Sequence, residues 1–337
     1  MKYAYDALDR LQSSTDALGR ITSYQYDAAS NLTQRTDARG LITRYFPDDL
    51  NRVDLVQHCT AGAPPGQCTG SYLVDSVDYT YNEVGFRTQL LDSTGLSVYT
   101  PDALERLTSV TTNSGTPGAK TVSYTYDSPD GIAAPYPGQR TRITYPDGKT
   151  VNYTYEKDGR MRSVTDWLAK QTVYNYDDAG RLTTTLYPNT ICAAYGYDAA
   201  DRLTSVMNRR MAAPPVCSPG DTVVSSFTYS LDAVGNRQEM VDSSGTHGYQ
   251  YDDLYRLRQA SYPGGPIDNY TYDHNGNRLM ENSTTYKYDA GDQMTWDGVR
   301  AYGYDANGNQ TGRGSDVFSY DHENRLTKIV LPKHRGS

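Results

Sequence analysis

A Tyr-Asp pair recurs from one end of this chain to the other, and it constrains the fold more than any other feature. Successive copies stand about 20–22 residues apart through much of the sequence, and the interval shortens to 16 residues from Tyr272 onward. A regular interval of this size is typical of a repeat architecture in which each copy is one supersecondary unit. The pairs are Tyr5-Asp6, Tyr26-Asp27, Tyr126-Asp127, Tyr176-Asp177, Tyr197-Asp198, Tyr251-Asp252, Tyr272-Asp273, Tyr288-Asp289, Tyr304-Asp305 and Tyr320-Asp321.

Each copy has the pattern of a β-hairpin. Tyrosine and β-branched residues alternate with other side chains before the pair, as in Val173-Tyr174-Asn175-Tyr176, and an alternation of period two indicates a strand. After Asp177 comes a short polar turn that ends in Gly180, which accepts a left-handed backbone without steric penalty. Arg181 then opens a second alternating segment. We therefore predict an all-β fold of antiparallel hairpins, with turns alternating between two edges and almost no helix.

The repeated polar residues are interpreted as structural rather than catalytic. A catalytic carboxylate needs a unique environment that shifts its pKa, whereas a residue present in every repeat has no unique environment. We expect the aspartates to form turns, and Arg181, Arg202 and Arg256 to pair with neighbouring aspartates or to lie across tyrosine rings. The motif residues that represent the repeat are Tyr176, Asp177, Gly180, Arg181, Tyr197, Asp198, Arg202, Tyr251, Asp252, Tyr272, Asp273 and Gly276.

The composition excludes several classes of function. A net charge of −8 argues against a nucleic-acid or anionic-membrane partner, and no stretch approaches the ~20 consecutive apolar residues of a membrane span. With 32 Tyr against 4 Phe and 2 Trp, tyrosine rings must supply much of the buried area. The sequence shows no zinc spacing, no nucleophile with its base and no phosphate loop. We therefore predict no catalytic, cofactor-binding or metal-binding residues and no cofactor.

The four cysteines stand in or beside two insertions that break the repeat rhythm. Cys59 and Cys68 bracket one Ala-Pro-Pro segment, and Cys192 and Cys217 bracket a longer one. Four cysteines allow three pairings, and the sequential pairing, Cys59 with Cys68 and Cys192 with Cys217, is favoured because each bond would close a loop at its base. Disulfides would imply an oxidising compartment. The alternative is four free thiols in a cytoplasmic or secretion-loaded protein.

The sequence of residues 145–189 closely resembles the YD repeats of rearrangement-hotspot (Rhs) proteins, which teneurins and the C components of insecticidal toxin complexes share. Residues 226–245 and 321–331 resemble the same family. The resemblance implies hairpins coiled into a spiral sheet that forms a hollow shell, and in toxin members that shell encloses a C-terminal effector segment. The Asp-Pro-x-Gly segment that the family links to self-cleavage does not occur here. We therefore expect a fragment of the repeat region.

Residues 1–331 are expected to form one continuous YD-repeat module with insertions near 59–70 and 208–221, and residues 332–337 resemble an expression-vector tail. The leading hypothesis is a non-catalytic structural scaffold, part of a shell that encapsulates or displays a C-terminal effector of a bacterial polymorphic toxin or a cell-surface protein. A second is an adhesion module whose exposed tyrosines bind carbohydrate or a cell-surface receptor. A third, less favoured, is an enzyme with its site on an inserted loop.

The partner expected under the leading hypothesis is the effector or another segment of the parent chain. Secretion or delivery to a cell surface is expected, with the export signal outside this sequence. Because a spiral sheet cut at both ends leaves unpaired strand edges near Tyr3 and Lys328, end-to-end self-association is also expected.

Overall fold

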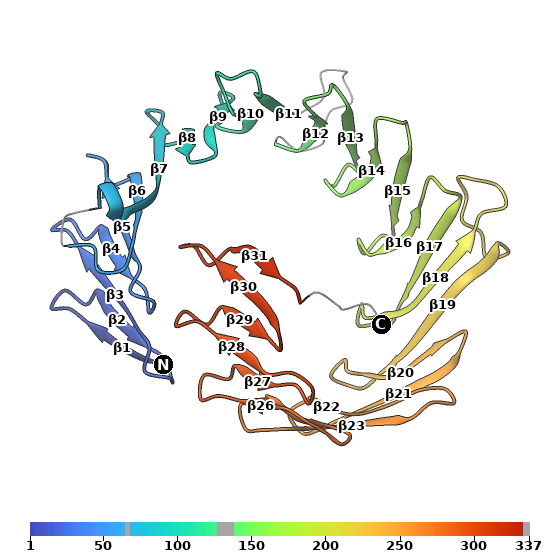
Figure 1. The fold of residues 1–337 in the computed structure, drawn as a ribbon. Coiled ribbons are helices and arrows are strands. Elements are labelled where there is room, and N and C mark those ends of the chain that lie inside the picture. The colour runs from blue at the N-terminus through green and yellow to red at the C-terminus, as the bar shows by residue number, and fades with distance from the viewer. Residues whose placement is uncertain (65–67, 127–137, 333–337) are drawn as a thin grey trace. The chain divides into compact units, whose positions relative to one another are not determined.

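The structure is a computed structural model that describes residues 1–64, 68–126 and 138–332. Its secondary structure consists of 31 β-strands and one short 3-10 helix, η1 (Gly70–Tyr72). The all-β prediction is therefore confirmed (Figure 1). No helix in the described part of the chain has the length and apolar character needed to cross a membrane. The predicted turn residue Asp127, the middle of the first insertion and residues 333–337 of the expected tail lie outside the described residues.

The first half of the chain holds strands of four to nine residues. They are β1 (Lys2–Tyr5), β2 (Leu11–Thr15), β3 (Ile21–Tyr26), β4 (Leu32–Thr36), β5 (Ile42–Pro47), β6 (Val53–Cys59), β7 (Leu73–Tyr81), β8 (Arg87–Asp92), β9 (Gly95–Pro101), β10 (Leu107–Thr112), β11 (Lys120–Tyr126), β12 (Arg140–Thr144), β13 (Thr150–Tyr155), β14 (Met161–Thr165), β15 (Gln171–Tyr176) and β16 (Leu182–Leu186).

The second half begins with long strands and ends with short ones. They are β17 (Ile191–Tyr197), β18 (Leu203–Arg210), β19 (Thr222–Leu231), β20 (Arg237–Asp242), β21 (Gly245–Tyr251), β22 (Leu257–Ser261), β23 (Ile267–Tyr272), β24 (Arg278–Glu281), β25 (Thr284–Thr285), β26 (Lys287–Tyr288), β27 (Met294–Trp296), β28 (Tyr302–Tyr304), β29 (Gln310–Arg313), β30 (Asp316–Tyr320) and β31 (Leu326–Val330). The 16-residue interval leaves fewer residues for each strand once the turn is made, which explains the shortening.

Within each sheet, strands that follow one another in the chain pair in antiparallel order. Strands β1 to β25 belong to one 25-stranded sheet, β26 and β27 form a two-stranded sheet, and β28 to β31 form a four-stranded sheet. By their packing the residues fall into two units. Unit 1 contains residues 1–99, 112–119 and the described residues from 271 onward, and unit 2 contains residues 100–111 and 120–270.

The Tyr-Asp turn leaves the same mark on the register of many hairpins. In the β15–β16 hairpin, Asn175 pairs with Thr184 but Tyr176 pairs with Leu182, so the register shifts by one residue beside the turn. The same shift occurs at Tyr26, Tyr155 and Tyr197. A short loop that ends in a left-handed residue produces this bulge and strengthens the local strand twist. We call the edge that carries these turns the first edge, and the opposite edge the second edge.

Complete burial is confined to a few small side chains. Some described residues are less than about 2 % exposed. Among these, the largest side chains belong to Cys59, Cys68 and Cys192. Around them lie two apolar clusters, one built on Ile42 and Ala63 and the other on Leu186 and Met211. The tyrosines that the structure describes are absent from the buried core and lie half-buried or exposed. Many of the rings are partly buried, and hydroxyls such as those of Tyr176 and Tyr197 donate to backbone carbonyls.

Gly180 gives a direct test of the turn assignment. Its φ is +85°, and an added Cβ would meet the Arg160 guanidinium at 3.0 Å. We expect Gly180→Val to lower the free energy of unfolding by about 1–3 kcal/mol because a β-branched residue is strained at positive φ. Asp178→Ala, at an exposed turn position, should change it by less than about 0.5 kcal/mol. Urea denaturation measures both values, and equal stability of the two variants would contradict the assignment.

Candidate functional site

The turn around Asp177 shows what the repeated residues do. Numbered from its aspartate, the turn has Asp177 at position 1, Gly180 at position 4 and Arg181 at position 5. The Asp177 carboxylate accepts a hydrogen bond from the Arg181 backbone N–H at 2.9 Å and another from the Arg181 Nε at 2.7 Å. The backbone N–H of Gly180 donates to the Asp177 carbonyl at 2.9 Å. One carboxylate therefore fixes both the backbone of the turn and the direction of the arginine.

The same Asp-to-Arg pair closes turns along the whole chain. It occurs at Asp6 with Arg10, Asp48 with Arg52, Asp102 with Arg106, Asp198 with Arg202, Asp252 with Arg256 and Asp321 with Arg325. At Asp27, Asp232, Asp273 and Asp305 an asparagine at position 5 donates to the carboxylate in place of the arginine. The carboxylates of these asparagine-containing turns thus bind their own turn.

The turn at Asp177 also holds the next turn on the same edge. The Arg181 guanidinium lies 5.3 Å from the centre of the Tyr197 ring and donates to the Asp201 carboxylate at 2.7 Å. In return the Tyr197 hydroxyl donates to the Leu182 carbonyl at 2.9 Å. We call this exchange between neighbouring turns the interlock. It gives the motif tyrosine, aspartate and arginine a structural role together.

Hydrogen bonds lower the pKa values of several turn carboxylates. For Asp177 and Asp198 the largest contribution comes from the backbone N–H at position 5, followed by the arginine side chain at that position. For Asp48 the Arg52 side chain contributes most. The Asp242 carboxylate on the second edge has its pKa lowered to about 2, mainly by the Ser244 hydroxyl and backbone N–H. These carboxylates are therefore fully ionised at neutral pH, which suits an ion pair and does not suit a general acid.

Within unit 1, turns that are far apart in sequence also contact one another. Arg39 pairs with Asp37 at 2.9 Å and lies 3.6 Å from the Asp305 carboxylate. Its guanidinium also donates to the Asp321 carbonyl at 3.1 Å. The Asn307 side chain donates to Asp37 at 2.6 Å. We call this junction the seam. The Asp37 side chain is only 3 % exposed there, so removing these partners would leave a buried polar group unpaired.

Two histidines meet beside the seam. The rings of His58 and His322 have their centres 5.6 Å apart, and the His322 Nε2 atom is buried without a hydrogen-bond partner among the described residues. Cavities of about 330 Å³ and 270 Å³ adjoin the pair, and Glu323 lines both of them. Burial lowers the pKa of His58, and the Glu323 carboxylate is the largest influence in the opposite direction. His58 is therefore neutral at physiological pH.

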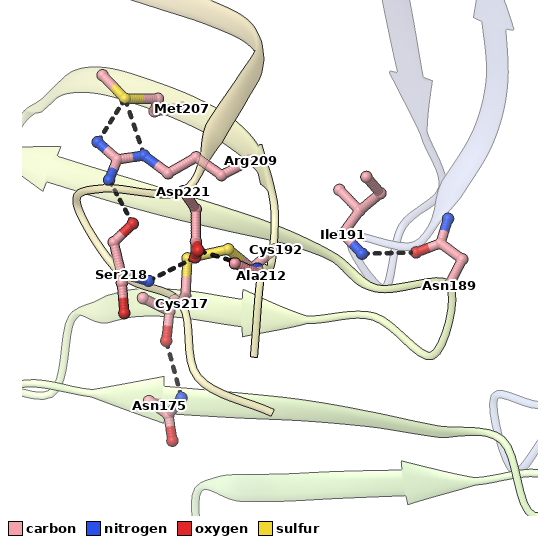
Figure 2. The surroundings of a disulfide bond; sticks show 11 residues. Asn175, Asn189, Ile191, Cys192, Met207, Arg209, Ala212, Cys217, Ser218 and Asp221 are labelled. Atoms are coloured by element: carbon pink, nitrogen blue, oxygen red, sulfur yellow. Dashed lines mark hydrogen bonds between the residues drawn. A yellow bond between two sulfur atoms is a disulfide. The ribbon is translucent and has the colours of Figure 1, made fainter. Parts of the chain in front are cut away.

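The histidines do not form a metal centre with the nearby carboxylates. In a metal centre, His, Cys, Asp or Glu side chains hold their metal-binding atoms close together. Among the described residues, Cys192, Cys217 and Asp221 form such a set of three. There the two sulfurs form a disulfide, so neither is a thiolate that could bind a metal. Asp221 instead accepts hydrogen bonds from the backbone N–H groups of Ala212 at 3.0 Å and Ser218 at 2.7 Å. Figure 2 shows these bonds beside the disulfide.

Both insertions are closed by disulfides. Cys59 is bonded to Cys68, and Cys192 to Cys217, with Cα–Cα distances of 5.7 Å and 5.9 Å. This is the sequential pairing that the sequence favoured. Each bond lies at the centre of one of the two apolar clusters. The disulfides therefore supply packing where the repeat pattern is interrupted.

Sequence reasoning identified the turn residues but missed the seam. Arg39, Asn307 and His322 occupy repeat positions, so nothing in their local pattern distinguishes them from residues in other turns. The one available signal is the shortened interval after Tyr272, which marks the repeats that supply one side of the seam. It gives no indication of which turns they contact.

Two family models match parts of the chain. The RHS Repeat model matches residues 5–43 and 176–207, and the Teneurin YD-shell model matches residues 226–335. The residues that these models match therefore carry repeats of the RHS and YD-shell type. The matched regions contain the interlocked turns and the late repeats of the seam. No curated protein matches the sequence.

Solved structures share the fold over nearly the whole chain. TcdB2-TccC3 without its hypervariable C-terminal region has a TM-score of 0.75 at 16 % identity, covering 99 % of this chain and 19 % of that chain. TcdB2-TccC3 gives 0.73 at 17 % identity over 98 % and 20 %. The Photorhabdus luminescens Tc holotoxin pore gives 0.59 at 16 % identity over 98 % and 22 %. This YD-repeat chain therefore spans about a fifth of the length of the structures it resembles.

The turn carboxylates make the fold sensitive to acid. The pKa values of turn aspartates such as Asp48, Asp177 and Asp198 are lower in the folded chain than in the unfolded chain, so the unfolded chain binds more protons in the interval between the two values. The stabilisation is therefore complete above the unfolded value of about 3.9 and is lost as the pH falls through the folded values. We expect the melting temperature to be flat from about pH 7 to pH 5 and to fall steeply below about pH 4, as circular dichroism would show.

A pair of variants isolates one carboxylate. Asp177→Asn should lower the melting temperature at neutral pH. The difference from the wild type should shrink as the pH falls from about 4 through the lowered folded-state pKa of Asp177, where the wild-type carboxyl becomes protonated too. Asp178→Asn, at the neighbouring exposed position, is the control and should show no such convergence. If both variants follow the same pH dependence, the turn carboxylate is not the origin of the acid sensitivity.

Reduction should weaken both insertions. The disulfides span sequence separations of 9 and 25 residues, and closing loops of that size stabilises a fold by on the order of 3 kcal/mol each. We expect reductant to lower the melting temperature, and Cys192→Ser with Cys217→Ser to reproduce part of that loss without reductant. Intact-mass measurement after alkylation checks the starting state. Alkylation of all four cysteines in protein purified under oxidising conditions would refute the pairing.

Proposed function

We propose that this chain is a non-catalytic wall segment of a shell that encloses an effector segment of its parent polypeptide. The observation that carries the proposal is the interlock. The motif carboxylate, guanidinium and tyrosine hydroxyl are each engaged in holding one turn to itself or to the next. Residues committed in this way supply a continuous, hydrogen-bonded sheet and leave no free nucleophile or base of the repeated kind.

The solved relatives of the same fold support a shell role. They are TcdB2-TccC3 structures, and one of them lacks a hypervariable C-terminal region. A variable region at the C-terminal end of a chain with this fold is consistent with an effector segment that can be exchanged while the shell is kept. We extend this to the present protein as a proposal, together with secretion or delivery to a cell surface and an effector segment as the partner. The disulfides support an oxidising compartment.

One surface feature favours the adhesion alternative. Tyr145, Trp167 and Tyr187 stand at successive turns of the second edge in unit 2 and are 38 %, 48 % and 38 % exposed. Tyr145 and Trp167 meet edge to face at 6.1 Å between ring centres. Exposed aromatic rings of this kind can stack on sugars or anchor a protein partner.

Protease protection of the complete gene product tests the shell proposal. A segment outside the repeats should resist a non-specific protease while the repeats are folded, and Arg39→Ala should expose it because the seam loses its central guanidinium. Arg162→Ala is the matched control, since Arg162 is 64 % exposed and its nearest carboxylate is 3.8 Å away. Equal cleavage in all three proteins would overturn the proposal. Binding of the wild type, but not of Trp167→Ala, on a glycan array would support the adhesion role instead.

A further inference from the structure

In many first-edge turns, the side chain at position 5 donates a hydrogen bond to the next turn along that edge. Arg10 donates to the Asp27 carbonyl at 2.9 Å, and Arg202 donates to the Asp232 carbonyl at 2.7 Å. Where position 5 is asparagine, its side chain donates instead to the position 4 side chain of the next turn. These bonds are Asn31 to Asn51 at 2.7 Å, Asn277 to Asp292 at 2.7 Å and Asn309 to Asn324 at 2.8 Å.

The joint between the turns at Asp232 and Asp252 departs from this rule. Asn236, at position 5, donates to its own Asp232 carboxylate at 2.9 Å and makes no side-chain bond to the next turn in the described structure. The residue that should accept that bond, at position 4 of the next turn, is Tyr255. It has a φ of +59° and is 60 % exposed. A bulky aromatic residue at positive φ is an outlier, and strain of this kind concentrates at functional positions.

A hollow of about 430 Å³ lies at this joint, entirely within unit 2. Its lining combines aromatic rings with acidic and amide side chains and contains no arginine, lysine or histidine. Asp253 is exposed and accepts no hydrogen bond from any described residue. The rings and carboxylates that line the hollow belong to Tyr249, Tyr251, Tyr255, Asp232, Asp252 and Asp253.

Other joints show what fills this space. The position 5 guanidinium lies over the motif tyrosine of the next turn, 4.7 Å from the ring centre for Arg10 on Tyr26 and 4.8 Å for Arg52 on Tyr81. The equivalent ring here is Tyr251. Its hydroxyl donates to the Arg237 carbonyl at 2.9 Å, as the Tyr26 hydroxyl donates to the Leu11 carbonyl at 3.0 Å. Tyr251 is therefore positioned to receive a guanidinium that this joint's own turn does not supply.

We propose that this hollow binds the guanidinium group of an arginine side chain from a separate polypeptide segment. The Tyr251 face supplies the cation–π contact, and the Asp253 carboxylate supplies a charge-assisted hydrogen bond. Arginine is favoured over lysine because its planar group can stack and donate at the same time. A neutral sugar would use the rings but would leave the Asp253 charge without a counterion. The proposal does not depend on the shell function.

The binding test uses N-acetyl-arginine amide as the probe and saturation-transfer NMR as the measurement. One stacked and paired guanidinium at an open site should give a dissociation constant on the order of 1 mM. N-acetyl-lysine amide should bind at least several-fold more weakly, and methyl glucoside should not bind. Binding of methyl glucoside in preference to the arginine probe would overturn the proposal in favour of a sugar site, and no binding of any probe at tenfold higher concentration would overturn it outright.

Two variants show whether the hollow is the site. Asn236→Arg should place a guanidinium from the chain itself over Tyr251, which should abolish probe binding and raise the melting temperature. Asn309→Arg is the matched control, because that joint is already bridged to Asn324, and it should leave probe binding unchanged. Asp253→Asn changes an exposed residue and should weaken binding at least fivefold with little effect on folding. Unchanged binding in both Asn236→Arg and Asp253→Asn would place the probe elsewhere and reject the proposal.

Discussion

The carboxylate at position 1 of the turn is the group on which the rest of this structure depends. It binds the backbone N–H and the side chain of position 5, and so it shapes the turn and aims the arginine at the next one. An isolated two-stranded hairpin is at best marginally stable in water. Because each arginine and each motif tyrosine reaches the neighbouring hairpin, stability accumulates along the row as it does in other repeat proteins. The ionised aspartate is thus the common requirement of turn, hairpin and sheet.

The disulfides show what happens where that requirement is not met. Both insertions interrupt the succession of Tyr-Asp turns, and each is closed by a covalent bond surrounded by one of the two apolar clusters. Elsewhere the described residues contain almost no fully buried large side chain. The interlocks and the disulfides therefore supply the stabilisation that a buried aliphatic core supplies in most domains.

Local chemistry made much of this fold predictable. Asp177, Gly180 and Arg181 predict a turn because their hydrogen bonds and backbone preferences act within five residues of one another. The alternation before Tyr176 predicts a strand. The pairing of Cys192 with Cys217 followed from their position at the base of one insertion. The seam could not be predicted, because Arg39 and Asn307 have the same local sequence context as residues that bind only their neighbours. The hollow beside Tyr255 could not be predicted from the sequence either. An asparagine at position 5 bonds to the next turn at other joints but not at this one.

The scarcity of buried apolar surface has a thermodynamic consequence. The heat capacity change of unfolding rises with the apolar area exposed and falls with the polar area, and typical domains show about 12–15 cal/mol/K per residue. In this chain the tyrosines remain half-buried and the aliphatic clusters are small. The change per residue should therefore lie below that range. A smaller heat capacity change flattens the curve of stability against temperature, so the folded state should weaken only gradually on cooling and retain similar stability over a wide interval of temperature.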